Sequence, residues 1–436
     1  MADRAPVRQG HGSGQGCELG WKRALLLRIF FPSNGIAPAV KRSPLLPIFL
    51  IVLVDVLGLT IILPLLPFYA EHLGASATVV GLLISTYALC QLIAGPILGR
   101  MSDHIGRKPL LIVSQMGTLA GFLILAFSNT LSLVFLSRII DGLTAGNLSL
   151  AQAYIADVTE PENRAKSFGI IGIAFGIGFL IGPAISGFLA QFGLAYPIFA
   201  AAFLSASSIV CTATLLPKVE PHTNQGESGP GGRRLGILEW RGYAEYFKRP
   251  ALGALLWQFF FFAFSFSLFV SGFALYAQRR YTFHGQPFGT KEVGYIFAYV
   301  GFLGLILQGG LIGRLVKWLG ERTLVWTGFG VSALGYGLLA WTNTIGQLLG
   351  ASTVSSYGGV LRPSVTSLIT QQAGKREQGV VLGLTQSITS VSQIVAPVIA
   401  GTLIDHGQLA VWALATGGVA LVGMVVSFRH KSDEHA

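Results

Sequence analysis

The amino-acid sequence predicts an all-α polytopic membrane protein with twelve transmembrane helices, arranged as two six-helix bundles related by a pseudo-two-fold axis. Three observations predict this fold class. Apolar residues make up 52% of the 436 residues and charged residues only 11%, which excludes an ordinary water-soluble globule. Apolar runs of about 20 residues recur along the chain, and that length spans the hydrocarbon core of a bilayer. A single sequence offset superimposes the first half of the chain on the second.

The first 45 residues are polar, glycine-rich and basic, and we expect a cytoplasmic tail. Their one apolar run, residues 24–31, is broken by Arg28 and is too short for a signal-peptide core or a span. The first predicted bundle, 46–216, has spans at 46–69, 79–99, 110–128, 131–156, 167–190 and 196–216. The second, 251–428, has spans at 251–277, 293–313, 323–341, 345–371, 379–403 and 409–428.

A polar stretch, residues 217–250, separates the two predicted bundles. Its glycine-rich part, 222–232, is followed by a basic segment rich in Trp and Tyr. This composition predicts a flexible linker that leads into a helix at the membrane interface. Residues 429–436 are predicted to form a second cytoplasmic tail.

The basic residues are distributed very unevenly between the loops on the two sides of the membrane. With both termini in the cytoplasm, 25 Lys and Arg residues lie in cytoplasmic segments, and only Arg279, Arg280 and Lys291 lie on the opposite side. Basic residues collect in cytoplasmic loops, so this split predicts the orientation. It also explains the net charge of +11 without a nucleic-acid partner. We expect the plasma membrane, which is the inner membrane in a bacterium.

A shift of 214 residues aligns the two halves. A fixed offset between two six-span halves indicates duplication in parallel orientation, as in transporters that rock two bundles about a central site. The aligned pairs are Gly99-Arg100 with Gly313-Arg314, Gly106 with Gly320, Gly169 with Gly383, Pro183 with Pro397 and Gly187 with Gly401.

The loop after the second span resembles the signature loop between helices 2 and 3 of the major facilitator superfamily, G-x-x-x-D-x-x-G-R-K/R. Asp103 can cap a helix N-terminus and Arg107 can bridge to an acid on a neighbouring helix end, such as Asp157. We expect a conformational clasp that stabilises the outward-open state; the alternative is a basic turn that only fixes topology. The matching residues are Gly99, Asp103, Gly106, Arg107 and Lys108.

Two further spans carry motifs of the same family. Arg138 and Gly142 resemble the R-x-x-x-G signature of helix 4. The fifth span resembles the G-P-x-x-G-G signature of helix 5, which is associated with the drug:proton antiporter branch, although Ser186 replaces one glycine. The residues of this signature are Gly178, Gly182, Pro183 and Gly187.

The first span, with Asp55 and Gly58, resembles helix 1 of the tetracycline-resistance efflux proteins. The resemblance covers residues 46–428 and is densest in 46–190. It implies a proton-coupled secondary transporter that exports small hydrophobic or amphipathic compounds. The third and ninth spans contain no acid, whereas the tetracycline exporters carry acids in both helices, which argues against tetracycline itself as the substrate.

Four ionisable residues lie inside predicted spans, where a charge costs at least about 2.5 kcal/mol. Asp55 lies about 14 Å into the first span and can bind and release a proton, unless an arginine holds it permanently. Arg138 and Asp141 share a helical face; they form a structural pair, or the arginine exchanges partners. Arg362, beside an expected helix break at residues 357–359, can attract an anionic substrate group, pair with an acid or snorkel.

Several polar side chains are predicted to provide hydrogen bonds to a substrate in an apolar central cavity. The aromatic run 259–269 mostly faces lipid, and one of its faces can line that cavity. The predicted cavity residues are Tyr87, Gln91, Gln115, Asn147, Gln152 and Arg362.

The sequence contains no P-loop, no zinc-ligand spacing and no nucleophile–base motif. Cys17, Cys90 and Cys211 are far apart and imply neither a disulfide nor a metal site. We therefore expect a protein that is not an enzyme and has no cofactor. Its expected partners are a small-molecule substrate, protons and the lipid bilayer, without nucleic acid, and it is expected to be a monomer. Proton-coupled uptake of a nutrient and a non-transporting receptor or scaffold are the alternatives.

Overall fold

The computed structural model describes residues 45–159, 164–217, 240–373 and 377–433, and the statements below concern these residues. The predicted N-terminal tail and most of the predicted linker lie outside them. The first half contains α2 (Leu45–His72), α3 (Ala77–Ile105), α4 (Arg107–Ala126), α5 (Leu131–Leu143), α6 (Asn147–Val158), α7 (Arg164–Ala190) and α8 (Ala195–Leu215).

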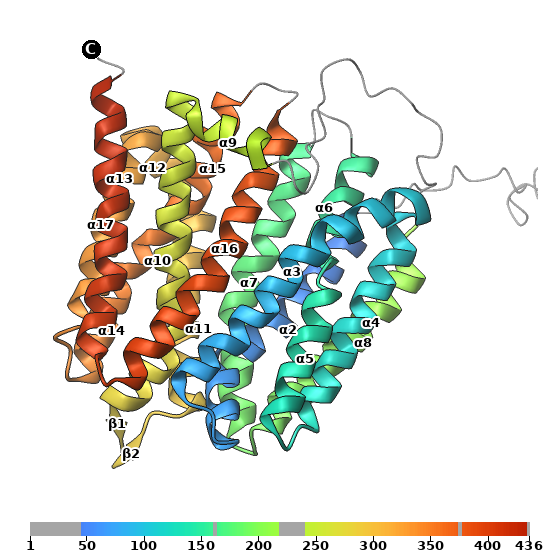
Figure 1. The fold of residues 1–436 in the computed structure, drawn as a ribbon, viewed down its shortest axis with the longest axis vertical. Coiled ribbons are helices and arrows are strands. Elements are labelled where there is room, and N and C mark those ends of the chain that lie inside the picture. Colours follow the sequence, from blue (N-terminus) through green and yellow to red (C-terminus); the bar gives the residue numbers. More distant parts are fainter. Residues whose placement is uncertain (1–44, 160–163, 218–239, 374–376, 434–436) are drawn as a thin grey trace, which may run out of the picture. The chain divides into compact units, whose positions relative to one another are not determined.

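The second half repeats this arrangement after a short helix, α9 (Trp240–Lys248), at the place where the sequence predicts an interfacial helix. Its elements are α10 (Pro250–Arg280), β1 (Thr282–Phe283), β2 (Gln286–Pro287), α11 (Thr290–Ile306), the π-helix η2 (Leu307–Leu311), α12 (Ile312–Leu319), α13 (Glu321–Leu338), α14 (Ile345–Ser356), the 3-10 helix η3 (Tyr357–Val360), α15 (Leu361–Gln372), α16 (Gln378–Asp405) and α17 (Leu409–Asp433). The two short strands form an antiparallel hairpin, in which Thr282 pairs with Pro287 and Phe283 with Gln286 (Figure 1).

Ten helical segments of the described chain are long and apolar enough to cross a membrane. They agree with ten of the twelve predicted spans, and α5 with α6 counts as one of them. The other two predicted spans fall on α13 and on the run α14–η3–α15. For these two, the count of twelve remains a prediction.

Two of the predicted spans contain a break, and the eighth also contains the π-helix η2. The tenth breaks at η3, where the sequence predicts a break, but the fourth was expected to be continuous and instead breaks between α5 and α6 at residues 144–146. Gly146 and Gly358 lie at these breaks. A side chain at Gly146 would collide with Leu98, and one at Gly358 would collide with Ser332. The offset of 214 places one break on the other. The repeat therefore extends to local irregularities of the helices.

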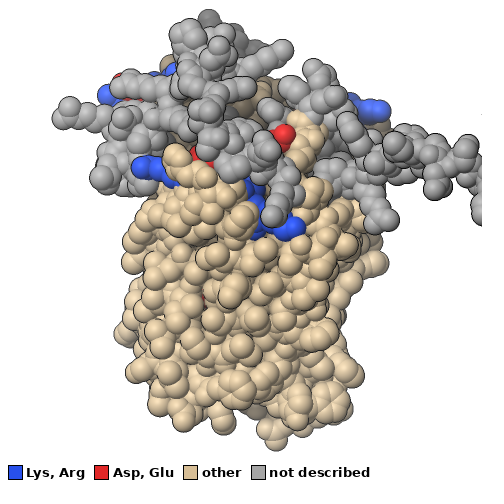
Figure 2. Space-filling model, turned by 90° about the vertical axis from the view of Figure 1, so that its right-hand side faces the viewer, with Lys and Arg blue, Asp and Glu red and all other residues tan. Residues whose placement is uncertain are grey.

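We name the two ends of the helices after nearby features. The linker end carries α9, Gly106 and Gly320, and the hairpin end carries β1 and β2 (top and bottom of Figure 1). Figure 2 shows Lys and Arg gathered at the linker end of one face; below them, the described part of that face shows no charged side chain. An uncharged belt is what a lipid-facing surface requires.

The contacts between the halves follow the repeat. Gly187 of α7 lies against the backbone of α11 at Lys291, and Gly401 of α16 lies against the backbone of α3 at Ala77. The offset of 214 converts each contact into the other. Small residues at both positions let the backbones approach closely, which drives helix association in lipid. The halves are therefore packed together by a pseudo-two-fold pair of helix contacts.

The hydrophobic core differs between the two ends. At the hairpin end, one cluster joins both halves and includes Leu65, Leu83, Phe273 and Trp412. Toward the linker end, the core divides into one cluster of the first half, around Tyr154, and one separate cluster of the second half. The two halves thus share a core only at the hairpin end.

Candidate transport site

The acid of α2 is held by hydroxyl and amide groups from neighbouring helices. Ser208 of α8 donates to Asp55 Oδ1 at 3.1 Å, and Ser208 in turn accepts from Gln115 Nε2 of α4 at 2.7 Å. Gln115 is fully buried and interacts with Asp55 as well. Among the described residues, Asp55 is therefore bonded to neutral partners and not to an arginine, so the structural alternative of a permanent ion pair is not what is observed.

Arg138 and Asp141 form the ion pair that their spacing predicts. Arg138 Nη1 lies 3.4 Å from Asp141 Oδ2, and both side chains are buried in α5. A second nitrogen of the guanidinium, Nη2, is buried with no hydrogen-bond partner in the described structure. Gly121 of α4 allows this approach, because a Cβ there would collide with Asp141. Arg138 therefore pairs with Asp141 through Nη1, while Nη2 is available to another acceptor.

Tyr87 of α3 connects the two acidic positions. It is close enough to interact electrostatically with Asp55, Arg138 and Asp141, and Gln91 Nε2 donates to its hydroxyl at 3.3 Å. The charge of Asp141 also acts on Asp55 electrostatically. The fold thus brings the three predicted proton-coupling residues together with three of the predicted cavity residues. Two buried acids, one of which pairs with an arginine, can take up a proton without leaving an isolated charge.

The residues of the predicted clasp form ion pairs at the linker end, while their conformational role stays a prediction. Arg107 Nη2 lies 2.7 Å from Asp103 Oδ1, and Arg107 Nε lies 2.9 Å from Asp157 Oδ2 of α6. Arg107 also contacts Ser102. All these partners belong to the first half, so the bonds join α3, α4 and α6 within that half.

One detail of the clasp was predicted wrongly. Asp103 was expected to cap a helix, but the residue before α4 is Gly106, at a φ of 101°, and it offers no side-chain cap. Asp103 reaches Arg107 instead, because the tight turn at Gly106 brings the two side chains together. Lys108 donates to the carbonyls of Ala213 and Leu216 at 2.7 and 2.6 Å, and so binds the C-terminus of α8. Gly99 accepts from Ser102 Oγ at 2.6 Å.

The glycines of the helix 5 motif lie at close helix contacts. A Cβ at Gly178 or Gly182 would collide with α2, at Val56 and Thr60 respectively. Thr60 Oγ1 donates to the carbonyl of Gly178 at 2.9 Å and fixes α7 against α2. The carbonyl of Pro183, the residue after Gly182, lies close to Gly294 of α11. This motif therefore packs α7 between the two halves.

The remaining predicted cavity residues do not join the acid cluster. Asn147 begins α6, and its Oδ1 is buried without a partner in the described chain. Gln152 is exposed. Arg362 belongs to the second half, is exposed, and lies 5.8 Å from the ring centroid of Phe175 in α7.

A network at the hairpin end was missed. Arg279 Nη2 lies 3.4 Å from Glu71 and 3.8 Å from Asp405, so α10 is linked to α2 and α16. Asp405 also accepts hydrogen bonds from the backbone nitrogens of Ala77 and Thr78 at 2.7 and 2.8 Å. It caps α3 from the other half. The available signal was Arg279 itself, one of only three basic residues predicted on that side.

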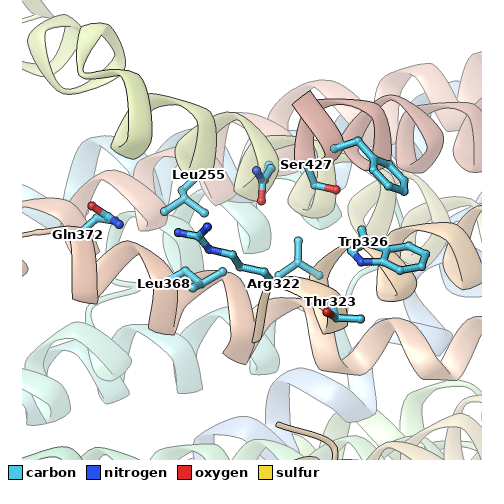
Figure 3. A pocket seen from close by; sticks show the side chains of 10 residues that line it. Leu255, Arg322, Thr323, Trp326, Leu368, Gln372 and Ser427 are labelled. Carbon is cyan, nitrogen blue, oxygen red and sulfur yellow. The ribbon is translucent and has the colours of Figure 1, made fainter. Parts of the chain in front are cut away.

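A pocket near the linker end lies apart from this site. It is enclosed by α10, α13, α15 and α17 of the second half, with Arg322, Trp326 and Ser427 among its lining residues (Figure 3). None of the predicted site residues lines it. In the part of the chain that the structure describes, no cluster of three or more His, Cys, Asp or Glu could hold a metal ion.

Comparisons with known proteins agree with this architecture. The Major Facilitator Superfamily model matches residues 48–347 and 310–436. The tetracycline resistance protein, class H, of Pasteurella multocida is 29% identical over 84% of this chain and 90% of its own length. Multidrug resistance protein 1 of Bacillus subtilis is 29% identical over 87% of this chain and 94% of its own length.

Solved structures support the same fold. The human organic anion transporter MFSD10 (TETRAN) has a TM-score of 0.67 at 22% identity, covering 88% of this chain and 98% of that one. The nucleoside transporter NupG has a TM-score of 0.67 at 16% identity, covering 89% and 99%. At these identities the likeness concerns the fold alone. The chain belongs to the major facilitator superfamily, is not an enzyme, and has proteins named for tetracycline resistance and multidrug resistance among its relatives.

Proposed function

We propose that this transporter exports small hydrophobic or amphipathic compounds in exchange for protons. The observation that carries the proposal is Asp55, an acid about 15 Å from the start of α2, held by Ser208 and adjacent to the Arg138–Asp141 pair. An acid at that depth is costly to leave charged and unpaired, so binding and release of a proton is its natural chemistry. The relatives named for tetracycline and multidrug resistance support export.

The coupling step follows from the shared arginine. When one of the two acids is protonated, Arg138 is attracted only to the other. Its unpartnered Nη2 can move toward Asp55 while Nη1 leaves Asp141, or the reverse. Substrate that occupies the space beside Tyr87 and Gln91 would favour one arrangement over the other. Proton and substrate then compete through the position of one guanidinium.

We propose that the linker end faces the cytoplasm of a plasma-membrane protein, as the 25 to 3 distribution of basic residues predicts. The shared core and the Arg279 network then close the outer side. The substrate would reach the site from the cytoplasm in this state. The clasp of Asp103, Arg107 and Asp157 is proposed to bias the balance between this state and the outward-open one.

The test is to substitute Asp55 and to measure transport by the purified variants in liposomes. Asp55→Asn should still bind substrate but lose proton-driven efflux, since an amide cannot carry the proton. Asp55→Glu keeps a titratable group and serves as the control, which should retain coupling. Full proton-coupled transport by Asp55→Asn in a defined pH gradient would falsify the proposal.

The same liposomes separate the two alternatives. A proton-coupled nutrient importer would accumulate its substrate on the side that protons enter, whereas an antiporter accumulates it on the side that protons leave, so the two give opposite signs of the gradient response. A receptor or scaffold would show neither substrate counterflow nor proton flux.

A further inference from the structure

On the basis of the proposed function, we infer that the transported compound carries an anionic oxygen group, such as a carboxylate, and that Arg362 binds it. Both interior acids belong to the first half of this protein, where Asp141 is paired with Arg138, and the second half contributes a base without an acid. The first half contributes Asp55 and Asp141 to the interior, and the second half contributes Arg362.

Arg362 lies at the depth of the transport site. It is in the first turn of α15, ten residues before that helix ends at Gln372, which corresponds to about 15 Å at about 1.5 Å per residue. Asp55 lies ten residues after the first residue of α2, at a similar distance from the linker end. Phe175, which the guanidinium of Arg362 contacts, is eleven residues into α7. These positions place Arg362 in the middle of the bundle and exclude snorkelling to a membrane surface.

The two intramembrane arginines differ in burial and pairing. Arg138 is 5% exposed and lies 3.4 Å from Asp141, as expected of a structural or coupling pair. Arg362 is exposed, and no described acid lies within ion-pair distance of it. A guanidinium that solvent can reach, and that lacks a protein counter-ion, is ready to accept a carboxylate through two parallel hydrogen bonds.

The surroundings of Arg362 suit an amphipathic anion. Phe175 stacks with Phe179 at 6.5 Å between ring centroids, so the arginine stands at the edge of an aromatic wall on α7. Gln308 belongs to the π-helix η2, which contacts η3; it is exposed, and its amide reaches the carbonyl of Gly359 only at 3.5 Å. A bond that long is easily exchanged for one to a ligand oxygen. Charge, aromatic surface and a donor amide thus lie together.

The helix irregularities of the second half create this arrangement. The π-helix η2 and the 3-10 helix η3 are in contact with each other, and Arg362 follows η3 by two residues. A π-helical turn shifts the side chains that follow it around the helix, and such turns are frequent at functional sites. Leu305, three residues before Gln308, lies 3.3 Å from a Cβ placed at Gly176. The same irregular region therefore contacts the first half beside Phe175.

The experiment measures binding to the purified full chain in detergent by isothermal titration calorimetry, without a proton gradient. The probes are naphthalene, biphenyl and indole scaffolds, each as a carboxylate, a primary amide and a methylammonium derivative. In the wild type, at least one carboxylate should bind tenfold or more tightly than its amide, and the ammonium compound should bind most weakly. In Arg362→Gln, the carboxylate and the amide should bind with affinities that differ by less than twofold.

Two variants complete the design. Arg314→Gln removes the same charge from an exposed position in α12 of the same half and should leave the ratio unchanged. Arg362→Lys keeps the charge but loses the paired hydrogen bonds, so its carboxylate-to-amide affinity ratio should lie between those of the wild type and Arg362→Gln. This variant decides the outcome if Arg362→Gln does not fold. If no carboxylate binds more tightly than its amide in the wild type, or if the preference survives in Arg362→Gln, the inference is overturned.

This result is independent of proton coupling. If the carboxylate preference is present but the liposomes show no proton-driven transport, the proposed antiport fails while Arg362 remains an anion-binding residue. If transport is proton-coupled but no preference for the carboxylate is found, the proposed antiport stands and Arg362 is not an anion-binding residue.

Discussion

The two halves of the protein share their packing but not their charges. The first half holds three intramembrane ionisable residues at one level, and the offset of 214 puts neutral residues at all three corresponding positions of the second half. All three neutral counterparts are buried. The corresponding pairs are Asp55 with Phe269, Arg138 with Ser352 and Asp141 with Ser355.

The backbone around these pairs is nevertheless the same. Gly121 of α4 lies against Asp141 of α5, and Gly335 of α13 lies against Ser355 of α14, with the same offset. In lipid, close approach of helices depends on small residues and not on the polarity of the group that they meet. A repeat can therefore keep its architecture while one copy acquires a charged site and the other loses or never gains it.

The largest expected effect comes from removing the arginine of the charged half. Arg138→Leu leaves Asp141 buried without its partner, and breaking such a pair costs about 3–5 kcal/mol if the acid stays charged. Transport should be nearly abolished, and the thermal midpoint in detergent should fall. Ser352→Ala, at the corresponding position of the other half, should change both by little. Equal effects of the two substitutions would contradict the assignment of the coupling site to one half.

The shared packing predicts matched effects in the two halves. Gly187→Ala and Gly401→Ala each place a Cβ against a facing backbone and should destabilise the protein by about 1–3 kcal/mol. Gly383→Ala meets open space in the described structure and serves as the control, with a neutral or slightly stabilising effect. Thermal unfolding in detergent measures all three. A strong effect of only one of the two interface variants would show that the halves do not pack equivalently.

The two acids of the first half should not act independently. Asp55→Asn and Asp141→Asn each remove one acid that Arg138 can approach, so the effect of the double variant on the free energy of unfolding, measured in detergent, should differ from the sum of the single effects by about 0.5–3 kcal/mol. Asp141→Asn alone should shift the pH optimum of transport. Strict additivity, or an Asp141→Asn profile identical to that of the wild type at every pH, would reduce Asp141 to a neutralising neighbour.

The smallest effect concerns the hairpin end, where the halves also differ. Asp405 caps α3, whereas the offset places Gln191 opposite the start of α11, where Thr290 Oγ1 is buried without a partner among the described groups. A charge at a helix N-terminus contributes about 0.3–1 kcal/mol, up to about 2 when partly buried. Asp405→Asn should therefore shift the balance toward opening of the hairpin end by severalfold. Spin-label distances across that end measure the shift.

Gln191→Asn is the matched control for this measurement and should leave the distance distribution unchanged. An unchanged distribution in Asp405→Asn would mean that the shared apolar core alone keeps the hairpin end closed.

The sequence by itself determined the features that depend on local spacing. Spans follow from the length of apolar runs, and the Arg138–Asp141 pair follows from a separation of three residues, which brings both side chains onto one helical face. The break in the tenth span followed from its two glycines. The offset of 214 residues could also be identified in the sequence, and it relates the contact Gly187–Lys291 to the contact Ala77–Gly401.

Only the tertiary structure decided which distant residues meet. Ser208 lies 153 residues after Asp55, and Asp405 lies 328 residues after Ala77, so neither partner could be inferred without knowing how the helices pack. The break in the fourth span was missed because a single glycine in a helical run is a weak signal. Contacts between helices in lipid are set by shape along their whole length, and sequence spacing encodes shape only within one helix.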